Sequence, residues 1–145
     1  MLRFQVLHKV TYRGAIRTFS QGTLAAQNRF TDLVRLARDD AKIEEISVST
    51  LKASYDPKKH QIVDVREVSE QHKGIIPEAI CLPRGILERD IEKKVPISKE
   101  VVVYCAGGLR SILAAENLKR MGYSVKSLQG GYDVWKESGG EISKY

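Results

Sequence analysis

The chain has 145 residues, of which 42% are hydrophobic and 29% charged, and its formal net charge is +6. This length accommodates one domain with a full core, and the composition is that of an ordinary globular protein. No apolar run approaches the roughly 20 residues that cross a bilayer, so we expect no membrane insertion. Cys81 and Cys105 are too few for a disulfide scaffold and favour a reducing compartment.

The positive charge is concentrated at the N-terminus. Residues 1–31 contain no Asp or Glu, and four of the six net charges fall within residues 1–19. We therefore expect no nucleic-acid-binding groove on the fold. An acid-free, arginine-bearing and partly amphipathic N-terminus is typical of a mitochondrial transit peptide. RTFS, at residues 17–20, also resembles a matrix-protease site. We expect a transit peptide over 1–30, cleavage after Phe19 and location in the mitochondrion, in the matrix. A basic tail that touches acidic surfaces is the alternative.

From Thr31 onward the pattern is globular, and helices alternate with strands. Thr31 is expected to cap a helix whose apolar side carries Leu33, Val34, Leu36, Ala37 and Ala41. The predicted strands are short apolar runs at residues 46–50, 61–65, 79–82, 101–104 and 125–128. Further helical segments are expected around 51–54 and at 68–74, 85–93, 111–121 and 130–140.

Continuous apolar strands that alternate with helices indicate a parallel sheet covered on both faces, and therefore an α/β fold. In such sheets the functional site lies at the carboxyl ends of the strands. Cys105 follows the predicted strand at 101–104 directly. The sequence thus predicts that this thiol lies at the site.

The segment CAGGLRS, at residues 105–111, combines features that activate a thiol. Gly107 and Gly108 permit positive φ angles, so the backbone N–H groups of residues 106–111 can turn inward as an anion-binding nest. A helix that begins near Ser111 would direct its positive end at the sulfur. Arg110 adds a permanent positive charge. Both the helix and the charge lower a thiol pKa, so we expect an anion cradle around Cys105. A buried, inert cysteine is the structural alternative.

Five motifs in order resemble a single-domain rhodanese. They are DVRE at 64–67, GIIPEAICLP at 74–83, PRGILE at 83–88, CAGGLRS at 105–111 and LQGGYDVW at 128–135. The resemblance covers roughly residues 43–140. It implies a rhodanese-like three-layer α/β fold, with a central, mostly parallel sheet and helices on both faces. The expected domain runs from 31 to 145 and includes the N-terminal helix.

The resemblance also implies a sulfurtransferase. Cys105 would be the nucleophile and persulfide carrier, and Arg110 would bind the anion and stabilise the thiolate. The substrate-binding residues would be Ala106, Gly107, Gly108, Leu109 and Ser111. Sulfane sulfur would pass from thiosulfate or a related small anionic donor to cyanide, a thiol or an acceptor protein. No metal and no organic cofactor would be required.

Several residues outside this loop also bear on the site or the fold. Arg84 could help to bind the donor or form a surface salt bridge, and Cys81 is by default a buried strand residue, with a resolving cysteine as the alternative. Asp64 and Arg66 would be scaffold charges and Trp135 a core aromatic.

The chain departs from the family pattern at two positions: the family usually has His where this chain has Ile75, and Gly where it has Glu78. The nearby His72 is expected on the surface.

Three other functions compete with sulfur transfer. A persulfide carrier and a non-enzymatic rhodanese-like binding module would share the fold. Cysteine-dependent phosphatases and arsenate reductases use the spacing C-x5-R. Here Arg110 follows Cys105 with spacing C-x4-R. That loop is one residue shorter, which disfavours binding of a phosphoryl group.

Overall fold

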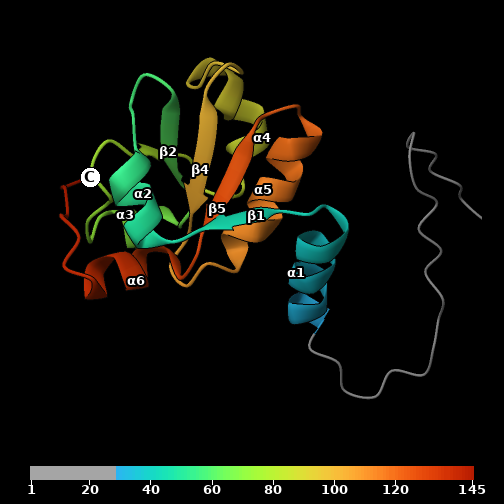
Figure 1. Ribbon diagram of the computed structural model, residues 1–145, viewed down its shortest axis with the longest axis horizontal. Helices are drawn as coiled ribbons and strands as arrows, with labels where there is room; N and C mark the ends of the chain where they lie inside the picture. The colour runs from blue at the N-terminus through green and yellow to red at the C-terminus, as the bar shows by residue number, and fades with distance from the viewer. Residues whose placement is uncertain (1–28) are drawn as a thin grey trace, which may run out of the picture.

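The short apolar strands form one parallel sheet at the centre of the fold (Figure 1). The computed structural model describes residues 29–145, so the predicted transit peptide lies almost entirely outside the described residues. The five strands are β1 (Glu44–Ile46), β2 (His60–Asp64), β3 (Ile80–Cys81), β4 (Glu100–Tyr104) and β5 (Val125–Leu128). Their order is β1-β5-β4-β2-β3, and every neighbouring pair is parallel.

Helices connect the strands and cover both faces of the sheet. They are α1 (Arg29–Asp40), α2 (Val48–Ser54), α3 (Val68–Gln71), α4 (Leu87–Asp90), α5 (Arg110–Arg120) and α6 (Gly131–Glu137), with a 3-10 turn η1 (Ile91–Lys93). None of the helices within residues 29–145 is long and apolar enough to cross a membrane.

Alternate side chains of the central strand pack into two separate hydrophobic cores, one on each face of the sheet. On β4, Val101 and Val103 pack with α1, α4 and α5, whereas Val102 and Tyr104 pack with α2 and α6 on the opposite face. All four side chains are at most 1% exposed. Because β4 is buried on both faces, its sequence is a continuous apolar run rather than an alternation. This confirms the expected three-layer α/β architecture.

The structure departs from the sequence-based expectation most clearly at the start of α2 and in α1. The strand expected at 46–50 runs instead from Glu44 to Ile46, because Ser47 caps the amino end of α2: its hydroxyl accepts a hydrogen bond from the Thr50 amide at 3.1 Å. Such a bond is the standard N-terminal cap. At the N-terminus, α1 begins at Arg29, so Thr31 lies inside the helix and does not cap it. Leu33, expected on the buried side, is 54% exposed.

Candidate active site

Cys105 lies at the carboxyl end of the central strand, where the parallel-sheet rule places a site. It follows β4 directly, and its side chain is 1% exposed. Its Sγ accepts a hydrogen bond from the Gly108 amide at 3.2 Å and lies 3.6 Å from Ser111 Oγ. Ser111 is fully buried; its hydroxyl donates to the Gly108 carbonyl and accepts from Ser127 Oγ at 2.9 Å. The sulfur therefore faces a backbone N–H and a buried hydroxyl.

Only one of the two loop glycines adopts the left-handed conformation. Gly108 has φ +87°, whereas Gly107 is not among the residues with positive φ, so the expectation for Gly107 was wrong. A side chain on Gly108 would bring a Cβ within 2.9 Å of the Gly130 amide nitrogen. The glycine at 108 is thus required both by its conformation and by the close approach of the segment that precedes α6.

The amino end of α6 holds the loop from the other side. The Tyr132 and Asp133 amides donate to the carbonyls of Cys105 and Ala106, at 2.8 and 3.1 Å. First-turn amides of a helix have no partner within the helix itself, and here the thiol loop supplies the acceptors. A Cβ on Gly131 would collide with both carbonyl oxygens. The closing Gly-Gly pair therefore lets α6 approach the backbone of the site.

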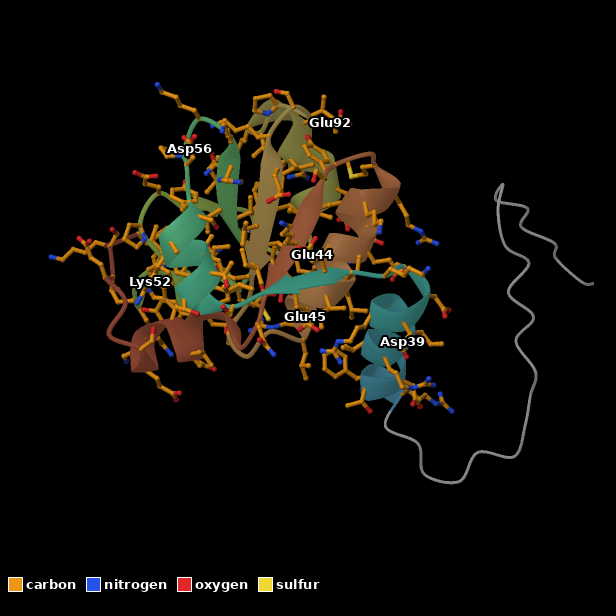
Figure 2. The ribbon with its side chains drawn as sticks, viewed as in Figure 1. Asp39, Glu44, Glu45, Lys52, Asp56 and Glu92 are labelled. Carbon is orange, nitrogen blue, oxygen red and sulfur yellow. The ribbon has the colours of Figure 1, made fainter. Side chains whose placement is uncertain are left out.

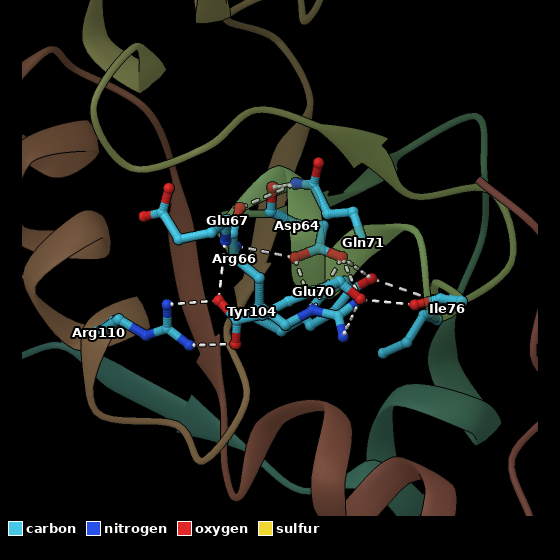
Figure 3. Close-up of polar contacts among 9 residues, drawn as sticks. Asp64, Arg66, Glu67, Glu70, Gln71, Ile76, Tyr104 and Arg110 are labelled. Carbon is cyan, nitrogen blue, oxygen red and sulfur yellow. Dashed lines mark hydrogen bonds and ion pairs between the residues drawn. The ribbon is translucent and has the colours of Figure 1, made fainter.

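Arg110, the first residue of α5, points toward α3 and forms a bidentate ion pair with Glu70 (Figure 3). Its two terminal nitrogens lie 2.9 and 2.7 Å from the Glu70 carboxylate oxygens. The hydrogen bonds from Arg110 hold the pKa of Glu70 at about 2, and Glu70 in turn raises the pKa of Arg110. Glu70 also accepts from the Glu67 amide at 2.9 Å. The loop cation is therefore paired with a carboxylate that the sequence did not single out.

A buried ion pair between Asp64 of β2 and Arg66 lies next to Glu70 (Figure 3), and the Tyr104 hydroxyl links it to β4. The Arg66 guanidinium binds the Asp64 carboxylate at 2.7 Å, and both side chains are at most 3% exposed. Tyr104 donates its hydroxyl to Asp64 at 2.7 Å and accepts from the Ile76 amide at 3.1 Å. Arg66 also bonds the Gly74 carbonyl at 2.7 Å. These bonds fix the loop after β2, which carries α3 and hence Glu70.

The remaining loop residues and Arg84 are placed as follows. Leu109 is 41% exposed and Gly107 is exposed, whereas Ala106 is half-buried. Arg84 forms an ion pair with Glu88 at 2.5 Å, and Glu88 also accepts from Asn117. In this structure Arg84 thus has the salt bridge that was one of its two expected roles.

Cys81 is separated from the site by a strand. It pairs in register with Asp64 of β2, whose other side faces Tyr104 of β4. Adjacent strands are about 4.8 Å apart, so Cys81 lies roughly two strand spacings from β4, beyond the Cα separation of a disulfide. Burial raises the pKa of the Cys81 thiol to about 11.

The two departures from the family pattern have different surroundings. Ile75 is 9% exposed and exchanges two backbone hydrogen bonds with Ser143, each 2.9 Å long. It therefore packs as an apolar residue under the C-terminal segment. Glu78 has φ +64°, a conformation that favours glycine.

His72 is exposed and stacks edge-on against Tyr145. Within residues 29–145 no group of His, Cys, Asp and Glu could hold a metal ion.

A glycine-rich loop around a thiol, at the carboxyl end of a central parallel strand, defines the class of the protein: an α/β fold with a cysteine-centred loop. The family model "Rhodanese-like domain" matches residues 47–138. The chain therefore belongs to the rhodanese-like domain family.

Individual relatives agree with this assignment. The putative sulfurtransferase YtwF of Bacillus subtilis is 30% identical over 66% of this chain and 92% of its own length. The thiosulfate sulfurtransferase GlpE of Coxiella burnetii is 35% identical over 61% of this chain and 85% of its own. A solved structure from Rhodopseudomonas palustris, of unknown function and named a possible tyrosine phosphatase, is 31% identical. It covers 90% of this chain and 100% of its own, with a TM-score of 0.68.

Proposed function

We propose that the protein is a sulfurtransferase that moves sulfane sulfur through a persulfide on Cys105. The observation that carries the proposal is the Sγ of Cys105 at the end of β4, with the Gly108 N–H directed at it and Arg110 beginning the helix behind it. Relatives named sulfurtransferases support the same chemistry.

In the first step the Cys105 thiol gives its proton to solvent water, and the thiolate attacks the outer sulfur of thiosulfate. A new S–S bond forms to Cys105, the S–S bond of the donor breaks, and its electron pair leaves with sulfite. This is covalent catalysis, which divides one transfer into two. Preorganised N–H donors such as that of Gly108 stabilise the anionic sulfur.

In the second step a nucleophilic acceptor, either cyanide or a thiolate, attacks the outer sulfur of the persulfide. The bond between the two sulfurs breaks, and the electron pair returns to Cys105 as the thiolate. The sulfur atom passes from donor to acceptor, and the protein returns to its starting state. Every bond made or broken lies on sulfur, so the residues of the loop suffice for the step.

The number of residues in the loop supports sulfur transfer over phosphate chemistry. Four residues separate Cys105 from Arg110, one fewer than in the C-x5-R loop of cysteine-dependent phosphatases, so the loop offers less room for a phosphoryl group. The loop length therefore disfavours phosphatase chemistry in this chain. A persulfide carrier that serves a partner protein would use the same thiol and differ only in its acceptor.

Intact-protein mass after incubation with thiosulfate and gel filtration tests the proposal. We expect the wild type to gain the mass of one sulfur atom, and to lose that gain when cyanide is added. Cys105→Ser should gain nothing, because serine is nearly isosteric but a poor sulfur nucleophile, whereas Cys81→Ala should behave as the wild type. A sulfur adduct that persists in Cys105→Ser would place the chemistry elsewhere.

A further inference from the structure

A pocket of about 430 Å³ lies between α2, α6 and residues 76–78. Its inner wall is formed by apolar and aromatic side chains: Leu51, Tyr55, Ile62, Ile76 and Trp135. None of its lining residues belongs to the Cys105 loop. Figure 2 shows Lys52, which stands at this pocket, on the outer side of α2. The volume is within the roughly 300–1,000 Å³ of small-molecule sites.

The rim of this pocket carries an excess of negative charge. Glu78 and Glu141 contribute two carboxylates, and Lys52 contributes one ammonium. Within residues 29–145 no arginine, lysine or histidine forms an ion pair with Glu78 or Glu141. Burial, together with the nearby Glu78 carboxylate, raises the pKa of the Tyr55 hydroxyl to about 12. The rim therefore carries more negative than positive charge, and its one lysine, Lys52, lies over the Trp135 ring and pairs with neither carboxylate.

The aromatic wall already accommodates an ammonium group. Lys52 Nζ lies 4.9 Å from the centroid of the Trp135 ring, within the range of a cation–π contact. The indole N–H donates to the Glu141 carbonyl at 2.8 Å, which fixes the orientation of the ring. The face of Trp135 is thus held in place where a positive charge can lie over it.

Glu78 is kept at a position that penalises its side chain. Its φ of +64° is in the left-handed region, where any residue with a Cβ is strained relative to glycine. The Gln61 amide donates to the Glu78 carbonyl at 3.0 Å and holds the backbone there. Strain of this kind persists where the surroundings enforce it, and it clusters at ligand sites. Here the strained residue places a carboxylate at the mouth of an aromatic pocket.

We propose that this pocket binds a small organic ammonium compound, one with a charged amine on a short apolar stem. The amine pairs with the Glu78 carboxylate, and the stem packs against Tyr55 and Trp135. Apolar walls with a few placed polar groups are the usual construction of such a site. The site is separate from Cys105, so its occupancy does not depend on whether the protein transfers sulfur.

Trp135 provides the measurement, because it is the only tryptophan in the chain. Cyclohexylmethylamine is the probe, and cyclohexylmethanol is its uncharged match. We expect the amine to change the Trp135 fluorescence saturably, and the alcohol to bind at least tenfold more weakly. Glu78→Gln keeps the size of the side chain and removes its charge, so it should weaken amine binding about tenfold, the factor that 1.4 kcal/mol represents.

Glu92→Gln is the matched control, since Glu92 is exposed on η1 at another end of the molecule (Figure 2). It should bind the amine as the wild type does. Equal affinity for amine and alcohol would overturn the proposal, as would equal loss of binding in the two variants. The proposal also fails if the amine produces no saturable change in the wild type.

Discussion

Glu70→Gln tests the ion pair that fixes Arg110 at the mouth of the Cys105 loop. The pKa of Glu70 is about 2, against an ordinary value of 4.5. One pKa unit is worth about 1.4 kcal/mol, so a fully desolvated pair would contribute roughly 3 kcal/mol to folding. The side chains of Arg110 and Glu70 are 34% and 29% exposed. Solvent screening therefore reduces the expected contribution to about 1–2 kcal/mol.

Urea denaturation at several pH values measures this contribution. At pH 7 the free energy of unfolding of Glu70→Gln should be about 1–2 kcal/mol below that of the wild type. A carboxylate with a lowered pKa stabilises the fold fully above its unfolded pKa and loses that effect as pH falls through the folded one. The difference between the two proteins should therefore shrink as pH falls from 4.5 toward 2. Glu92→Gln should not show this pH-dependent difference.

The same substitution changes the charge that an anionic donor meets. It removes one negative charge from beside the loop. At about 6–8 Å and an effective dielectric constant of about 40–80, that charge is worth roughly 0.5–1.4 kcal/mol. The KM for thiosulfate should therefore fall about two- to tenfold. A KM that rises would refute this reasoning, and would show that Glu70 orients Arg110 for the donor rather than neutralising it. Equal stability of variant and wild type at pH 7 would refute the energetic estimate.

Four further predictions concern other parts of the chain. Arg110→Ala should raise the KM for thiosulfate about 10- to 100-fold, the effect of losing a charge-assisted contact of about 1.5–3 kcal/mol, and Arg110→Lys should restore only part of the affinity. Wild-type KM values in both variants would show that backbone N–H groups alone bind the anion. Because burial raises the pKa of Cys81 to about 11, iodoacetamide should modify it slowly at neutral pH and faster as pH rises toward 11; rapid modification at pH 7 would contradict its burial. Gly131→Ala should lower the free energy of unfolding by about 2 kcal/mol and impair sulfur transfer, because its Cβ collides with the Cys105 carbonyl; unchanged thermal unfolding and turnover would contradict the clamp. We propose processing after Phe19, so protein recovered from mitochondria should begin at Ser20 by N-terminal sequencing; recovery of the full-length chain from the cytosol would refute it.

The placement of Cys105 could be predicted because β4 is buried on both faces. Such a strand must be a continuous apolar run, and Val101–Tyr104 is one. A thiol directly after it necessarily lies at the carboxyl edge of the sheet. Chain order and local pattern sufficed here, because the sequence neighbours of Cys105 are also its neighbours in space.

Glu70 could not be found in this way. It is separated from Arg110 by 40 residues, and its neighbours form a short helix that looks like any exposed turn. The pair exists only because α3 and α5 meet beyond the ends of β2 and β4. The difference between Gly107 and Gly108 was equally hidden, since it depends on the contact of Gly108 with Gly130. Tertiary contacts, rather than local propensity, decide both features.

The clamp of α6 on the Cys105 loop has a consequence for protein synthesis. The carbonyls of Cys105 and Ala106 are held by the amides of Tyr132 and Asp133, which the ribosome adds more than 25 residues later. During translation, β4 and Cys105 can therefore leave the ribosome before the α6 residues that bind the loop carbonyls have been added. The loop around Cys105 is therefore completed late in translation, after the strands and helices that support it.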